Sequence, residues 1–85
     1  ARVSDELILS ITASGNLVVV KTPPGGAHLL ASALDRASQG GDMKSIIGTI
    51  AGDDTVLVIS RNASGGKALA TELRDFIGGK KVRRK

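Results

Sequence analysis

The stretch SIIGTIAGDDTVLVIS, residues 45–60, contains two aliphatic runs on either side of Gly52-Asp53-Asp54. Both runs are rich in β-branched residues, which fit the pleated surface of a sheet. Glycine and aspartate favour turns, because glycine accepts positive φ and aspartate hydrogen-bonds nearby backbone groups. The stretch therefore predicts strands at 45–51 and 55–60, joined by a tight turn at 52–54.

The chain before this stretch repeats the strand–turn–strand pattern. Residues 7–13 and 17–22 predict two further strands, and Ser14-Gly15-Asn16 between them is a hairpin signal. Pro23-Pro24-Gly25-Gly26 then breaks the regular structure, since proline has no backbone N–H to donate.

A segment with helical periodicity follows each pair of strands. The helix expected at 27–38 gathers its apolar residues on one side: Leu29, Leu30, Ala33, Leu34 and Ala37. Its polar residues gather on the other: His28, Ser32, Asp35, Arg36 and Gln39. A second helix, at 67–77, has an apolar stripe made of Leu69, Leu73, Phe76 and Ile77. The order ββαββα predicts an α+β fold, a four-stranded mainly antiparallel sheet with two helices on one face.

Two of the predicted strands are apolar at every position. Residues 17–20 read Leu-Val-Val-Val, and residues 56–59 read Val-Leu-Val-Ile. A sheet with one solvated face normally alternates apolar and polar residues. Two helices cover only one face, so we expect another subunit on the other; the alternative is an ordinary central strand with scattered exposed valines.

The composition limits how so short a chain can be stabilised. The 85 residues have room for one domain, and Phe76 is the only aromatic residue. There is no cysteine, so no disulfide framework, and a single histidine makes a multi-histidine metal site within one chain impossible. Small domains without these supports often depend on partner subunits.

The net charge of +4 comes from one end of the chain. Five of the twelve basic residues lie at 80–85, which leaves seven basic and eight acidic residues in 1–79. We therefore expect a domain at 1–79 and a basic, disordered tail at 80–85; the alternative is an arm that contacts phosphates.

No apolar run approaches the roughly 18 residues that a membrane helix needs, and no signal peptide is present, so a cytoplasmic protein without a membrane partner is expected. Because the chain does not begin with Met, we expect a fragment of a longer protein.

Asp53-Asp54 is the strongest candidate for chemistry. Adjacent carboxylates repel, so the pair is either a structural turn or an anionic corner for a cation. A metal loop normally recruits three or more oxygen ligands close together, and none completes the set here. A guanidinium fits better, because its planar donors pair with carboxylates. His28 and Asp35, two helical turns apart, either form a solvated face or add an imidazole and a third carboxylate.

Catalysis and phosphate binding find little support in the sequence. Pro23-Pro24-Gly25-Gly26 precedes a helix but lacks the Gly-Lys-Ser/Thr of a phosphate-binding loop. The lone His28 has no nucleophile at a suitable spacing. We expect no catalytic residue, no metal and no cofactor, and hence no enzyme.

Two blocks together resemble one family. Asn16–Gly25, NLVVVKTPPG, and Ile47–Thr55, IGTIAGDDT, separated by one Ala/Leu-rich helix, are similar to the signature blocks of the C-terminal domain of bacterial arginine repressors. The resemblance covers residues 7–77. It implies a subunit that forms trimers and then a hexamer of two stacked trimers, with L-arginine as corepressor at the interface between trimers.

The resemblance also implies roles for single residues. Asp53 and Asp54 would face the arginine, Asp54 taking the guanidinium, and Ala51 would offer backbone groups to its amino-acid end. Asp35 would bind the α-amino group or help with the guanidinium. His28 stands where other members commonly have Gln, so a polar hydrogen-bonding group is kept there.

In this family a separate N-terminal winged helix-turn-helix domain reads operator DNA, and nothing in these 85 residues resembles it. The resemblance thus predicts the arginine-sensing, oligomer-forming part of a repressor of arginine biosynthesis genes, with DNA contacted only through the missing domain. Two alternatives stay open: a sensor of another amino acid, or a purely structural oligomerisation module.

Overall fold

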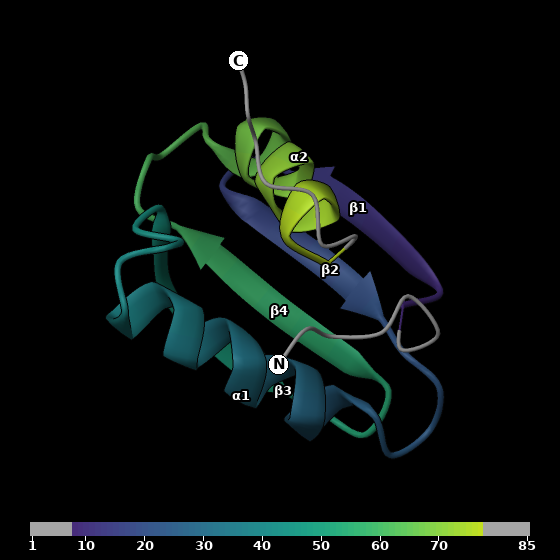
Figure 1. The fold of residues 1–85 in the computed structure, drawn as a ribbon. Coiled ribbons are helices and arrows are strands. Elements are labelled where there is room, and N and C mark those ends of the chain that lie inside the picture. Colours follow the sequence, from purple (N-terminus) through teal and green to yellow (C-terminus); the bar gives the residue numbers. More distant parts are fainter. Residues whose placement is uncertain (1–7, 78–85) are drawn as a thin grey trace.

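The computed structural model describes residues 8–77, which form a four-stranded sheet and two helices (Figure 1). The elements follow the order ββαββα: β1 (Ser10–Ser14), β2 (Leu17–Lys21), α1 (Ala27–Gln39), β3 (Ile46–Ala51), β4 (Thr55–Ser60) and α2 (Gly66–Ile77). The strands lie in the order β1-β2-β4-β3, and every neighbouring pair is antiparallel. The predicted fold class is confirmed. The expected start of the first strand at residue 7 and the tail at 80–85 lie outside the described residues.

The first strand differs most from its prediction, beginning at Ser10 and ending at Ser14. Its partner β2 ends at Lys21 and is followed by Thr22-Pro23. Because Pro23 has no backbone N–H to donate, the two strands cannot continue their ladder of hydrogen bonds. At the other end the loop holds only Gly15 and Asn16, because Ser14 pairs with Leu17. Gly15 has φ +60° and Asn16 has no positive φ, which is the pattern of a type II′ hairpin turn. The other predicted bounds agree to within one residue.

One face of the sheet carries both helices (Figure 1). The register pairs Val18 with Val58 and Val20 with Val56, so these four side chains point to the same side, and all are fully buried. α1 lies against β3 and β4, whereas α2 lies against β1 and β2. Together the elements close one hydrophobic core.

The sequence predicted that Leu29 lies on the buried side of α1. This prediction is wrong, because Leu29 is 59% exposed. α1 packs on the sheet through Leu30, Leu34 and Ala37. Leu29 is turned about 100° from Leu30 around the helix axis, which takes it past the edge of the contact. The predicted polar side is confirmed, and in α2 Phe76 is only half-buried while Leu69, Leu73 and Ile77 are buried.

The opposite face of the sheet, here called the open face, has no element over it within residues 8–77. The register places five apolar side chains there: Leu17, Val19, Leu57, Ile59 and Ile50. Four are half-buried and Ile50 is 62% exposed. They lie over β2, β4 and β3, whereas β1 adds only Ser10, Thr12 and Ser14. That another subunit covers this face stays a prediction.

Candidate functional site

The acidic turn Gly52-Asp53-Asp54 lies against the loop that leads from β2 into α1. In that loop Gly26 donates its backbone N–H to the Pro23 carbonyl at 2.9 Å, and Gly25 has φ +84°. Proline at the second position and glycine at the third, with positive φ, define a type II turn. The Pro-Pro-Gly-Gly sequence thus fixes the direction in which the chain enters the helix.

Three backbone hydrogen bonds tie the two segments together. The Thr22 N–H donates to the Asp54 carbonyl at 2.7 Å, and the N–H groups of Gly25 and Ala27 donate to the Asp53 carbonyl at 3.0 and 3.4 Å. The Asp53 carbonyl thereby satisfies donors at the start of α1, where Gly26 offers no side-chain cap. The two sequence blocks that carried the family resemblance are therefore one structural unit.

This unit brings Asp53 and His28 to the same end of the molecule. Asp53 is exposed, and its carbonyl rather than its carboxylate is engaged in the turn. His28 follows Ala27 directly in the first turn of α1 and is also exposed. A carboxylate and an imidazole thus stand at the solvent edge of one helix terminus.

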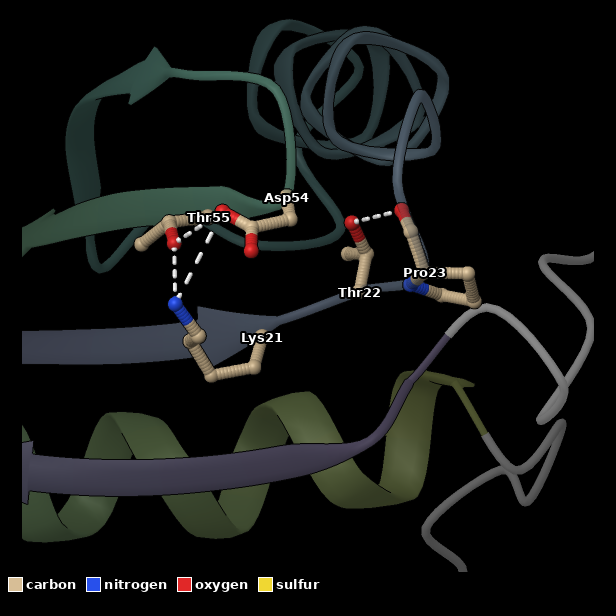
Figure 2. Close-up of polar contacts among 5 residues, drawn as sticks. All are labelled: Lys21, Thr22, Pro23, Asp54 and Thr55. Atoms are coloured by element: carbon tan, nitrogen blue, oxygen red, sulfur yellow. Dashed lines mark hydrogen bonds and ion pairs between the residues drawn. The ribbon is translucent and has the colours of Figure 1, made fainter.

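Asp54 carries an internal set of contacts (Figure 2). The Thr55 hydroxyl donates to Asp54 Oδ1 at 2.9 Å, and Lys21 Nζ donates to the same hydroxyl oxygen at 2.7 Å. Lys21 Nζ also lies 3.7 Å from Asp54 Oδ1. The Thr55 hydrogen bond, and after it the Lys21 charge, lower the pKa of Asp54 below its ordinary value.

Asp35 lies farther along α1. The Thr49 hydroxyl on β3 donates to Asp35 Oδ1 at 2.8 Å, so this half-buried carboxylate is held toward the sheet edge. Seven residues separate Asp35 from His28, which is about 10 Å along a helix axis. The fold thus brings His28 near the acidic turn and sets Asp35 beside Thr49. Ala51 is half-buried at the end of β3, an edge strand of the sheet.

The sequence model of the family described as "Arginine repressor, C-terminal domain" matches residues 4–75. The chain belongs to this family. The resemblance drawn from the two sequence blocks is thereby confirmed. As an arginine repressor C-terminal domain, the chain is a regulatory sensing and oligomerisation domain rather than an enzyme.

The described residues contain neither a membrane-spanning helix nor a metal-binding cluster. Neither α1 nor α2 is long and apolar enough to cross a bilayer. Within residues 8–77, no three His, Cys, Asp or Glu side chains come close enough together to form a metal site.

Three residues of the repressor domain's acidic region were missed in the sequence: Lys21, Thr49 and Thr55. Lys21 and Thr55 are register partners across β2 and β4. Their contact would have followed from pairing the second strand with the fourth. The strand order was not deduced from the sequence, so a lysine 33 residues before Asp54 gave no signal.

Proposed function

We propose that this domain senses L-arginine for a transcriptional repressor of arginine metabolism genes, arginine acting as corepressor at the interface between two trimers. The observation that carries the proposal is the acidic turn, tied by three backbone hydrogen bonds to the start of α1. Such a turn holds the backbone of two adjacent aspartates in place at the protein surface, where a guanidinium can pair with their carboxylates.

The five proposed arginine-binding residues are His28, Asp35, Ala51, Asp53 and Asp54. Asp53 and Asp54 supply the negative charge, and Asp54 takes the guanidinium. Among the described residues, the contacts of the Asp54 carboxylate run through Oδ1. His28 is a hydrogen-bonding group at the same end, while Asp35, about two helical turns away, binds the α-amino group or helps with the guanidinium. Ala51 offers backbone groups from an edge strand.

The open face supports assembly. Its five apolar side chains form a surface that a monomer would leave in water, and contiguous apolar surface of this kind marks interaction sites. We propose that it packs against other copies of the domain within a trimer, and that two trimers stack into a hexamer. A chain of this size gains from such burial, because its own core is small.

Arginine that binds across the trimer–trimer interface would stabilise the hexamer, because it binds the assembled state better than the separated one. We expect arginine to raise both the hexamer fraction and the melting temperature. At 100 times its Kd, a ligand of the assembled state contributes about 2.7 kcal/mol. Light scattering and thermal melts with and without arginine test this, and no change at millimolar arginine would contradict the proposal.

Competition experiments identify the ligand. Lysine and ornithine carry an ammonium in place of the guanidinium, and citrulline is neutral, so all three should compete poorly with arginine. Equal competition by any of them would instead favour a sensor of another amino acid.

Substitution of Asp54 tests the proposed site. Asp54→Asn removes the charge that takes the guanidinium, so we expect calorimetry to show weaker arginine binding while light scattering still shows a trimer. Asp42→Asn is the matched control, because Asp42 is an exposed aspartate in the loop between α1 and β3. Unchanged affinity in Asp54→Asn would move the site elsewhere.

One observation favours a second candidate function. Thr55 and Lys21 already engage Asp54 within the chain, as they would in a turn that is only structural. The domain would then be an oligomerisation module whose mass is indifferent to every ligand. The arginine titration monitored by mass separates the two functions.

The proposal places the whole protein in the cytoplasm, where arginine is made and sensed. Operator DNA would be bound through an N-terminal winged helix-turn-helix domain outside these 85 residues. The domain proper would span 1–79, followed by the basic tail at 80–85.

A further inference from the structure

Lys21 stands at the end of the open face, beside the acidic turn. It is the last residue of β2 and the register partner of Thr55, the first residue of β4. Figure 2 shows its ammonium reaching across to Thr55 and Asp54. Its Nζ lies 2.7 Å from the Thr55 hydroxyl oxygen and 3.7 Å from Asp54 Oδ1.

This contact adds little to the stability of the fold. The side chains of Lys21 and Asp54 are 47% and 50% exposed, so water and salt screen their attraction. Three backbone hydrogen bonds already hold the turn without them. The charge of Lys21 therefore has its main effect on the binding of a further charged group at the turn.

We propose that Lys21 is a resident cation of the acidic turn, which competes with the effector for Asp54 and so sets its affinity and selectivity. The inference rests on the proposed function. With Lys21 in place, the two carboxylates and one ammonium leave a net charge of −1 at the turn. An arriving cation must settle beside the ammonium or displace it.

The competition discriminates between ligands by their chemistry. A lysine or ornithine side chain offers the same compact ammonium that Lys21 already supplies, and therefore gains little by replacing it. A guanidinium offers a planar fork that reaches two oxygens at once, which an ammonium cannot match. Lys21 thus disfavours ammonium ligands more than guanidinium ligands.

The test compares the full 85-residue chain with its Lys21→Met variant by calorimetry, using L-arginine, agmatine and L-lysine. Methionine keeps an unbranched apolar stem and removes the charge. Two unit charges about 6 Å apart in water-like surroundings repel enough to change a binding constant about three- to fivefold. We expect arginine and agmatine to bind Lys21→Met tighter by about this factor, and lysine to gain at least as much.

Two controls separate this effect from a change in net charge or in folding. Lys67→Met makes the same charge change in the first turn of α2, next to Gly66, whose N–H donates to the Gly15 carbonyl near the far end of β2. It should leave arginine affinity unchanged. Lys21→Arg keeps the positive charge and brings a guanidinium fork of its own to Asp54, so it should bind arginine no tighter than the wild type. Circular dichroism melts establish that each variant is folded.

The outcomes are distinct. Unchanged or weaker arginine binding by folded Lys21→Met overturns the inference alone. If that variant loses affinity for arginine but not for agmatine, which lacks the carboxylate, Lys21 holds the carboxylate of the effector and is no competitor. A wild-type chain that binds no arginine at millimolar concentration overturns the proposed function and this inference with it.

Discussion

The two faces of the sheet are built from the same strands and similar residues, yet within residues 8–77 only one of them is covered by helices. Val18 and Val58 point to the helices and are fully buried. Their neighbours Val19 and Leu57 point to the open face and are half-buried at most. Strand residues alternate between faces, so an all-apolar strand serves two surfaces at once. The first surface stabilises the domain, and the second stays partly exposed among the described residues.

The acidic turn repeats this contrast on a smaller scale. Asp54 has Thr55 and Lys21 within the chain, whereas the exposed Asp53 has its carbonyl, not its carboxylate, tied to the start of α1. Within residues 8–77 the fold therefore fixes the backbone of both residues and engages the carboxylate of Asp54 alone. A ligand approaching this turn meets one carboxylate with resident partners and one that faces solvent.

The largest effect is expected from a charge on the face covered by the helices. Val58→Asp would bury a carboxylate without a partner among Val18, the helices and the rest of the core. The cost of an uncompensated buried charge, several kcal/mol, is comparable to the whole stability of a small domain. We expect circular dichroism to show an unfolded chain with no cooperative melt. A folded Val58→Asp would mean that this face is not the core.

Aspartate at the preceding residue, Leu57, should preserve the fold and abolish oligomerisation. Leu57→Asp places a charge in the middle of the open face, between Val19 and Ile50. We expect light scattering to show a monomer, with helix and strand signals kept. Thr12→Asp puts the same charge on the same face over β1, outside the apolar patch, and should leave the mass unchanged.

Two outcomes would contradict this prediction. If Leu57→Asp keeps the wild-type mass, the open face is not the subunit contact. If the variant unfolds, the contact is judged on the wild type instead: its melting temperature must then rise with protein concentration, and a melting temperature independent of concentration would argue against assembly through this face.

Replacing one glycine by alanine on each side of the sheet, Gly66→Ala and Gly48→Ala, sharpens the comparison further. A Cβ at Gly66 would lie 2.5 Å from the Gly15 carbonyl oxygen and 2.8 Å from that of Leu17, and these backbone atoms cannot move cheaply. Overpacking of this kind costs about 1–3 kcal/mol, which lowers the melting temperature of a small domain by roughly 5 °C or more.

Gly48 is the matched position, because it lies on the open face and a Cβ there would meet nothing within 4 Å. Gly48→Ala should leave the melting temperature unchanged or slightly higher, since alanine restricts the unfolded chain. Scanning calorimetry checks both variants. If Gly66→Ala melts no lower than Gly48→Ala, the methyl at Gly66 is accommodated and its close contacts do not limit the fold.

The sequence predicted the fold well because its signals were local. Gly15-Asn16 is a hairpin signal, Pro23-Pro24-Gly25-Gly26 can only be a turn, and alternation gives each strand residue its face. Leu29 was misplaced for an equally local reason. Periodicity gives the centre of an apolar stripe better than its edge, and the position of α1 over β3 and β4 decides which edge residues are covered.

The candidate site was predicted only in part, because its contacts join distant segments. The acidic turn was visible as Asp53-Asp54, and its relation to the Pro-Gly loop was suggested by the family resemblance. The backbone bonds from Thr22, Gly25 and Ala27 depend on how β4 pairs with β2, and no local pattern encodes that pairing. The partner of Asp35 was hidden for the same reason, since Thr49 reaches it from another element.

The smallest effect is expected at Asp54, the aspartate of the acidic turn whose carboxylate contacts Thr55 and Lys21. The pKa of Asp54 is lowered first by the Thr55 hydroxyl and then by the Lys21 charge. In the unfolded chain an aspartate has a pKa of about 3.9. A lowered pKa in the folded state means that this carboxylate contributes stability above about pH 3.9, which is lost as the pH falls through the lower value.

NMR titration of the side-chain carboxyl groups measures this directly. We expect Asp54 in the wild type to titrate below pH 3.9 or so. Thr55→Val should raise its pKa, and Lys21→Met should raise it less, because the hydroxyl is the larger cause. The contribution to folding is small, since both charged side chains are about half exposed and solvent screens them. If Thr55→Val leaves the Asp54 titration where it was, the carboxylate is not held by its own chain, and the contrast between Asp53 and Asp54 fails.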